Sequence, residues 1–298
     1  MKIYDCFMFF DEELILDIRL NILNKFVDFF VIVESKYNHK GEKRALKFDI
    51  KKFSKFKNKI IYIIHENIPE TIKLIKYTDS PKSIDSKNFY NATKRENSQR
   101  NAIMEGLKNS NDNDIILISD VDEIPNLNLF NFNKIKTKIT VFEQKFFYYK
   151  FDLYLPNFIW FGTKVIKKKD LISPQWARNI KCKKYSKFRI DILFSKTKYS
   201  DIQIIKDGGW HFSNIKSPEE IEIKYRSYLH HHEFEKSSMG LNDIKKIVRD
   251  KKAIYDLSVD KRENKIGNGA NLKNFDILKL PEYIINNKNK FNYWFDKK

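Results

Sequence analysis

Short apolar runs alternate with amphipathic segments along the first third of the chain. Helical spacing of apolar positions predicts helices over residues 12–27 and about 93–109. Apolar runs of strand length predict four strands, over residues 2–10, 28–34, 59–65 and 114–119. Strands that alternate with helices in this way are typical of an α/β fold, in which helices flank a mostly parallel central sheet on both faces.

The pattern changes in the rest of the chain. Residues 66–92 are polar and contain Pro69 and Pro81, which predicts a long loop. Over residues 142–161 ten of twenty positions are aromatic, and we expect β-strands there. Residues 218–236 predict a helix that starts at a proline. Neither a repeat nor a linker divides the chain, so we expect a single domain.

The fourth predicted strand runs directly into three acids, in the segment 114-DIILISDVDEIP-125. Asp120, Asp122 and Glu123 therefore follow the carboxyl end of a strand, which is the edge where α/β sheets bind ligands. A D-x-D pair at such an edge can hold Mg²⁺ or Mn²⁺, because both cations prefer oxygen ligands. An exposed acidic turn is the alternative. Three roles are open for Glu123: a ligand, an orienting group, or the partner of a lysine.

Three acids so close together need a partner, which could be a metal ion, a basic side chain or water at an exposed strand end. The helix before the strand runs back along it, so its N-terminal half lies beside the strand's carboxyl end. The strand rises about 20 Å over its length, and the helix rises about 13 Å from Asn109 back to Arg100. Arg100 could close most of that gap, and Arg95 is a weaker candidate. An ordinary surface arginine is the alternative.

The segment 207-DGGWHFS-213 is the second candidate for chemistry. Its glycines permit unusual backbone angles or a close approach. His211 could complete a metal site that Asp122 begins, although a lone histidine is more often structural. The aromatic block offers faces for sugar rings, but aromatic side chains at strand spacing are more often core. Its candidates are Trp160, Tyr148, Tyr149 and Tyr154.

Charge and composition narrow the function classes. The 298 residues carry a formal net charge of +18, but only nine of the 57 basic residues are arginine and the lysines are spread along the chain. We therefore expect no nucleic-acid partner. Cys6 and Cys182 are too few for a disulfide framework or a zinc cluster. With neither a signal peptide nor a run of ~20 apolar residues, we expect a cytoplasmic protein, or a host-cytoplasmic one if viral, without a membrane span.

Together these segments resemble glycosyltransferase family 17, which includes the enzyme that adds the bisecting N-acetylglucosamine (GlcNAc) to N-glycans. The matching segments are IYDCFMFFDEELILDIRLNIL, DFFVIVES, NSQRNAIMEGL, DIILISDVDEIP, FGTKV, GGWHFS and the helix ending HHEF. They occur in family order over residues 1–235, and the match fades beyond that point. The resemblance implies one GT-A-type nucleotide-sugar-binding domain over residues 1–298. We divide it into a nucleotide-binding half (1–125), an acceptor-side half (126–235) and a C-terminal extension (236–298).

The resemblance also implies roles for single residues. Asp120 and Asp122 would hold Mn²⁺ or Mg²⁺ against the donor diphosphate, with His211 as a further ligand. One of the two aspartates would also meet the ribose. The other residues expected at the donor are Glu34, Arg100, Asn101, Lys164 and Trp210.

The implied reaction is an inverting transfer of GlcNAc from UDP-GlcNAc to a glycan acceptor, with Asp122 as a catalytic residue at the metal. Inversion needs a carboxylate base near the acceptor hydroxyl. Glu123, Glu143 and Asp207 are candidates, and Glu123 is preferred because it must lie near the metal edge.

Two other classes are alternatives. A phosphohydrolase of the haloacid dehalogenase type also has D-x-D after a strand, with Thr or Val two residues past the second Asp, where this chain has Ile124. A non-catalytic basic protein that binds glycan or nucleic acid would show binding without turnover. The acceptor, the linkage and the oligomeric state stay open.

Overall fold

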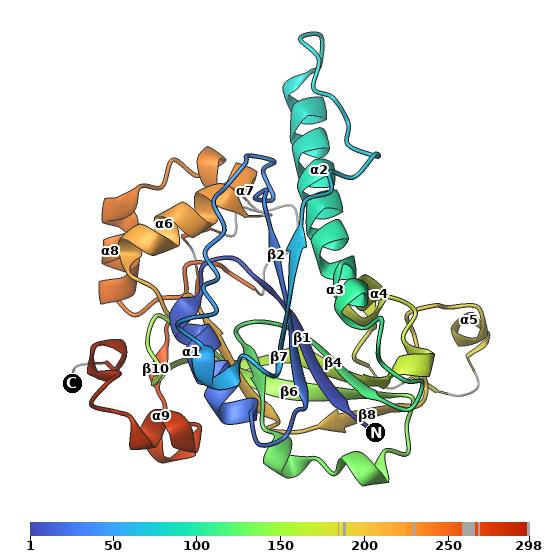
Figure 1. The fold of residues 1–298 in the computed structure, drawn as a ribbon. Coiled ribbons are helices and arrows are strands. Elements are labelled where there is room, and N and C mark those ends of the chain that lie inside the picture. Colours follow the sequence, from blue (N-terminus) through green and yellow to red (C-terminus); the bar gives the residue numbers. More distant parts are fainter. Residues whose placement is uncertain (184, 187–188, 229–230, 258–265, 268, 297–298) are drawn as a thin grey trace.

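A computed structural model describes the chain except residues 184, 187–188, 229–230, 258–265, 268 and 297–298 (Figure 1). Its strands are β1 (Ile3–Phe9), β2 (Phe29–Ser35), β3 (Ile60–His65), β4 (Ile115–Asp120), β5 (Glu123–Pro125), β6 (Ile139–Tyr148), β7 (Leu153–Lys167), β8 (Ile202–Ile205), β9 (Gly209–Ser213) and β10 (Lys273–Asn274). Its helices are α1 (Glu13–Leu23), α2 (Pro81–Asn101), α3 (Ile103–Gly106), α4 (Pro174–Asn179), α5 (Ile190–Leu193), α6 (Pro218–Ser227), α7 (His231–Lys236), α8 (Leu241–Arg249) and α9 (Glu282–Asn286).

The strands form one sheet of mixed direction. The strand order is β3-β2-β1-β4-β7-β6-β9-β5, with β10 paired to β7 and β8 paired to β6. The first four strands are parallel, as expected. The expectation of a mostly parallel sheet holds only in part for the other strands. β7 is antiparallel to both β4 and β6, and β5 is antiparallel to β9, whereas β6 pairs in parallel with β8 and β9. The aromatic block supplies β6 and β7.

Side chains alternate across the sheet and build a core on each face. Along β1, Phe7 and Phe9 pack with α1, whereas Tyr4 and Cys6 pack in the other cluster with residues of α3 and α4. This alternation is the two-residue period of a strand buried on both faces. The helices therefore cover both faces of the sheet, as predicted (Figure 1).

A third core forms beyond the parallel strands. Tyr148 and Tyr149, from the aromatic block, are 2% and 1% exposed and pack with α6, α7 and α8. They are core residues and do not offer faces to a ligand. Tyr154 packs against the first core, beside Phe147 and Phe275.

Two predicted boundaries differ from the structure. Residues 81–92, expected in a loop, belong to the long helix α2, whose first part extends away from the sheet (Figure 1). Ser80 caps this helix by accepting a hydrogen bond from the Ser83 amide at 3.3 Å, and Pro81 occupies the first turn. The helix expected over 218–236 is two helices, α6 and α7. In the described part of the chain, none of the helices has both the length and the apolar character needed to span a bilayer.

Candidate active site

A cavity of about 350 Å³ opens at the carboxyl ends of β1, β2 and β4. The chain leaves β1 toward β2 on one side, while β4 pairs on the other side, so this is the point where the strand order reverses. Such switch points create a crevice between neighbouring strand ends. Residues that end these strands line the cavity, among them Met8, Ser35 and Asp120.

A buried arginine explains how β4 can end in acids. Arg19, on α1, is fully buried and pairs with Asp5 at 2.6 Å. Its Nη1 also donates to the main-chain carbonyls of Asp120 and Val121 at 3.2 Å and of Glu123 at 2.7 Å. Charge-assisted bonds of this kind fix a backbone turn. Arg19 therefore fixes the main-chain path through the three acids.

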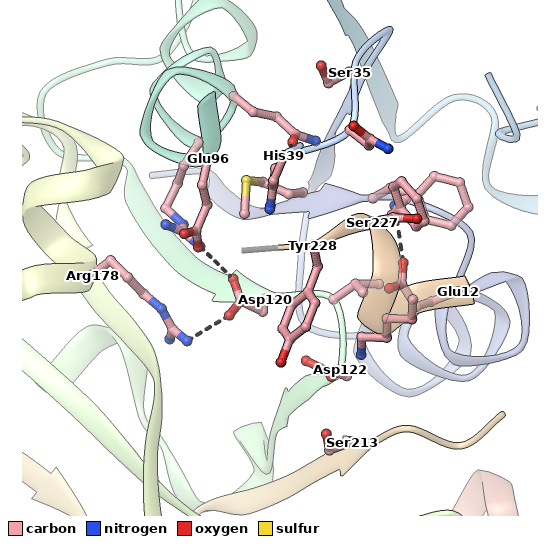
Figure 2. Close-up of a pocket in the computed structure, with 18 of the residues that line it drawn as sticks. Glu12, Ser35, His39, Glu96, Asp120, Asp122, Arg178, Ser213, Ser227 and Tyr228 are labelled. Atoms are coloured by element: carbon pink, nitrogen blue, oxygen red, sulfur yellow. Dashed lines mark hydrogen bonds and ion pairs between the residues drawn. The ribbon is translucent and has the colours of Figure 1, made fainter. Parts of the chain in front are cut away.

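Two arginines engage the Asp120 carboxylate, and Figure 2 shows one of them, Arg178. Arg100 Nη2 lies 3.1 Å from Oδ1, and Arg178 Nη2 lies 2.7 Å from Oδ2. Burial alone would raise the pKa of Asp120, but Arg178 and Arg100 together hold that pKa well below its usual range. Arg100 thus reaches Asp120, as the helix geometry suggested. Asp120 stays ionised, and both of its oxygens are engaged.

Glu123 organises the wall behind Asp120. It is fully buried and is absent from the lining of the cavity. Its carboxylate accepts hydrogen bonds from Trp160 Nε1 at 2.6 Å, from Arg178 Nη1 at 2.9 Å and from the Asp120 amide at 3.0 Å. These contacts hold Trp160 and Arg178 at the cavity and correspond to an orienting role.

Asp122 and His211 converge on the other side of the cavity. Antiparallel pairing of β5 with β9 brings them together, and His211 Nε2 lies 3.3 Å from Asp122 Oδ1. Burial would raise the pKa of Asp122, but the neighbouring His211 and Lys224 lower it overall. Gly209 permits this pairing: its φ is +145°, and a Cβ there would lie 2.3 Å from the Ile124 carbonyl oxygen.

The donor set of Asp122 and His211 fits a divalent cation in part. A carboxylate oxygen and an imidazole nitrogen that face each other can both ligate Mn²⁺, whereas Mg²⁺ prefers oxygen ligands and would use the carboxylate. Asp120, the other expected ligand, is occupied by arginines. Across the described residues, His, Cys, Asp and Glu side chains gather nowhere in a group of three that could hold a metal. The protein therefore offers two ligands, and a bound ion would need oxygens from a substrate or from water.

The loop after β2 forms the far end of the cavity. Ser35, Tyr37, Asn38 and His39 line it, together with Gln99 of α2. Glu34 itself does not line the cavity. Its carboxylate accepts hydrogen bonds from the Lys47 and Phe48 amides at 2.7 and 3.0 Å and from the Tyr62 hydroxyl at 2.8 Å, so it secures this loop from behind.

Several residues expected at the donor lie elsewhere. Asn101 accepts a hydrogen bond from the Gln175 amide at 3.0 Å, which joins α2 to α4. Lys164 is 2% exposed within β7, and burial lowers its pKa to about 8. Trp210, which neighbours His211 on a strand and so faces the opposite way, lines a separate cavity and donates to the Lys279 carbonyl at 3.1 Å. These three side chains do not line the candidate site.

None of the three candidate bases lines the cavity; Glu123 lies behind its wall, and the other two lie farther from it. Asp207 is 73% exposed and pairs with Lys145 at 2.6 Å. Glu143 is on β6 opposite Phe161. Neither residue lines the cavity.

Many residues of the site were not predicted from the sequence, among them Arg178, Glu12 and Lys224. Arg178 follows a Ser-Pro helix start in 173-SPQWARN-179, which predicts α4 but not its position beside Asp120. Glu12 follows β1, and its place after a strand of the parallel sheet was a usable signal. Lys224 is one lysine among many on α6, and only tertiary structure brings it to the cavity.

The fold and this site define a class of protein: an α/β protein with a charged cavity at the carboxyl edge of its parallel strands, the position where such sheets bind ligands. The chain belongs to glycosyltransferase family 17, whose sequence model matches residues 1–296. The match extends through the C-terminal region, where the resemblance had been expected to fade. A search of curated proteins found no match. The chain is therefore a glycosyltransferase, and the phosphohydrolase and non-catalytic alternatives are wrong.

Proposed function

We propose that the chain is a GT-A-type, metal-dependent, inverting transferase that takes GlcNAc from UDP-GlcNAc and passes it to a glycan. The observation that carries this proposal is the pairing of Asp122 with His211 beside Asp120, at the switch point of the parallel strands. Family membership supports the transfer reaction.

The donor's nucleoside occupies the end of the cavity formed by Ser35, Asn38, His39 and Gln99. Backbone and side-chain polar groups at the end of β2 suit a ribose and a base edge. The diphosphate then lies toward Asp122 and Lys224, on the opposite side of the cavity. His39 Nε2 lies 3.4 Å from Gln99 Oε1, so these two side chains are partly ordered before the donor binds.

The charge balance of the cavity supports metal dependence. Four carboxylates and four cationic side chains line it: Glu12, Glu96, Asp120 and Asp122 against Arg44, Arg100, Arg178 and Lys224. A diphosphate alone would gain little electrostatic binding energy in such a site, because the three arginines are already paired with carboxylates. A divalent cation held by Asp122 and His211 would supply the missing positive charge and stabilise the departing UDP.

The chain's own residues carry the rest of the chemistry. The Lys224 ammonium makes neither an ion pair nor a hydrogen bond with a described residue and acts electrostatically on Asp122, so it is available to the leaving diphosphate. Asp120 keeps Arg100 and Arg178 at the cavity wall. Glu123 holds Trp160 and Arg178 in position. We therefore assign Glu123 a positioning role in place of the base role expected from sequence.

The test is a UDP-release assay with UDP-GlcNAc, Mn²⁺ and a mannose-terminated oligosaccharide. Asp122→Asn and His211→Ala should each lower the rate by about 100-fold or more, because an unstabilised leaving group raises the barrier. Glu66→Gln is the control, since Glu66 is 57% exposed and its ion pair with Lys36 lies on the surface. An Asp122→Asn enzyme with wild-type rate and metal response would refute the proposal.

A further inference from the structure

A second cavity, of about 230 Å³, adjoins the candidate donor site. Glu12, Asp122 and Lys224 line both cavities, so these three side chains form the wall between them. Figure 2 shows Glu12 and Asp122 on the side of the donor site away from Glu96 and Arg178. A group on this wall can contact ligands in both spaces.

Glu12 presents on this wall a carboxylate oxygen that accepts no hydrogen bond from a described residue, and its charge acts on the nearby Lys216. Its Oε2 accepts hydrogen bonds from the Phe10 and Asp11 amides, both at 3.1 Å, which fix the side chain. Its Oε1 has no hydrogen-bond partner among the described residues. Asp122, the other carboxylate on the wall, faces His211.

The remaining carboxylates of the second cavity are engaged. Asp11 pairs with Lys216 at 2.6 Å, and Glu13 pairs with Lys52 at 2.6 Å. Glu220 accepts the Ser217 amide at 2.7 Å in the capping box of α6. None of the three lines the donor site.

The second cavity has groups suited to a sugar. Asn214 lines it and is 4% exposed, yet its Oδ1 is buried without a hydrogen-bond partner among the described residues. A buried polar atom of this kind is costly unless a ligand satisfies it. Trp294, also in the lining, provides an aromatic ring for the apolar face of a pyranose.

We propose that this second cavity binds the acceptor sugar and that Glu12 is the general base of the transfer. The inference rests on the function proposed above. Glu12 Oε1 takes the proton of an acceptor hydroxyl as its oxygen attacks the anomeric carbon of the donor sugar. The bond from that carbon to the diphosphate oxygen breaks, and its electron pair leaves with UDP. The proton passes from Glu12 to water, and the sugar is transferred with inversion.

The charge of the second cavity selects the acceptor. Five carboxylates line it, from Asp11, Glu12, Glu13, Asp122 and Glu220, against the two lysines Lys216 and Lys224. An anionic acceptor would be repelled there, although the whole chain carries a net charge of +18. The acceptor is therefore a neutral glycan.

The decisive variant is Glu12→Gln, compared with wild type and with the surface control Glu66→Gln. We expect UDP release from UDP-GlcNAc to fall by about 10²- to 10⁴-fold, with donor affinity, measured by calorimetry, changed less than about threefold. Glu12→Asp should recover part of the rate. Unchanged turnover in Glu12→Gln, with normal donor binding, would overturn the base assignment while leaving the proposed function intact.

A second comparison tests the acceptor site. A neutral mannose-terminated oligosaccharide should stimulate UDP release, and the same oligosaccharide carrying phosphate should not. Asn214→Gly, which tolerates the residue's φ of +52°, should raise KM for the neutral acceptor about tenfold or more without changing KM for the donor. Equal stimulation by both oligosaccharides would overturn the acceptor inference. Wild type that neither binds nor cleaves UDP-GlcNAc would overturn the proposed function and this inference with it.

Discussion

Single buried charges hold the acidic turn after β4 in place. Arg19 fixes the backbone of Asp120, Val121 and Glu123, and Arg178 neutralises two of the three acids. The acids are visible in the sequence, and Arg100 was predicted as their partner, because the rise of a helix and of the strand after it limits which helix residues can lie near the strand's end. The sequence could not show Arg178, which arrives from a segment more than fifty residues later.

Arg178→Ala should destabilise the protein strongly. The variant leaves Glu123 fully buried without its cation, and breaking a buried pair costs about 3–5 kcal/mol. Arg178→Lys should lose less stability, because lysine keeps the positive charge but lacks the planar guanidinium group that can bind two carboxylates at once. Urea unfolding measures both. Arg226→Ala, which breaks an exposed pair with Glu222, is the control, and a loss no larger than in that control would contradict the role of Arg178.

Lys164→Met should stabilise the protein and remove a pH dependence. Burial lowers the pKa of Lys164 from 10.5 to about 8. Between these values the unfolded chain holds the proton and the folded chain does not, so wild-type stability rises with pH through this window. In Lys164→Met this rise of stability with pH should vanish. At pH 7 the variant's free energy of unfolding should exceed that of wild type by at most about 3 kcal/mol. An unchanged slope in chemical unfolding from pH 7 to 10 would refute the assignment.

At the scale of elements, the parallel strands were predictable and their partners were not. Continuous apolar runs located β1 to β4 within one or two residues, because strands buried on both faces have little polar alternation. The start of α2 was missed, since Pro81 was taken as a loop residue although Ser80 precedes it as a cap. The pairing of β5 with β9, which joins Asp122 to His211, depends on tertiary contacts that local pattern does not contain.

Asn91 fixes the loop before α2 to the helix. The residue is 5% exposed; its Oδ1 accepts the Lys73 amide at 2.8 Å and its Nδ2 donates to the Lys73 carbonyl at 2.8 Å. Asn91→Ala should therefore increase amide hydrogen exchange across residues 66–80, at a local cost of about 1–3 kcal/mol. Ser86→Ala, at an exposed position of the same helix, should leave exchange unchanged. Equal exchange in both variants would show that the loop is held by other contacts.

At the scale of the whole molecule, the C-terminal region is part of the main core. Leu280, Ile284, Phe291 and Phe295 are buried in the same cluster as Phe7 and Phe9 of β1. The main chain of Trp294 also accepts a hydrogen bond from the Phe151 amide at 2.8 Å. Sequence pattern did not predict these contacts, because the apolar residues of this region are scattered among Asn and Lys. These contacts favour a single domain over a core with a separable extension.

Phe291→Ala tests this coupling. The ring is 1% exposed, so its removal should cost about 3–5 kcal/mol and lower the midpoint of one cooperative urea transition. Leu278→Ala, at a side chain that is 80% exposed, should change stability by less than about 0.5 kcal/mol. A separate early transition in the Phe291 variant, with the main transition unchanged, would indicate an independent C-terminal unit.

The most direct test of the central claim is calorimetric titration of UDP-GlcNAc, with and without Mn²⁺, into wild type and Asp122→Asn. GDP-mannose is the comparison for the nucleotide. The account predicts binding of UDP-GlcNAc that Mn²⁺ strengthens in wild type, and loss of the Mn²⁺ effect in a variant that remains folded. Binding that is equal in both proteins, or that does not respond to Mn²⁺, would contradict a donor site built on Asp122 and His211.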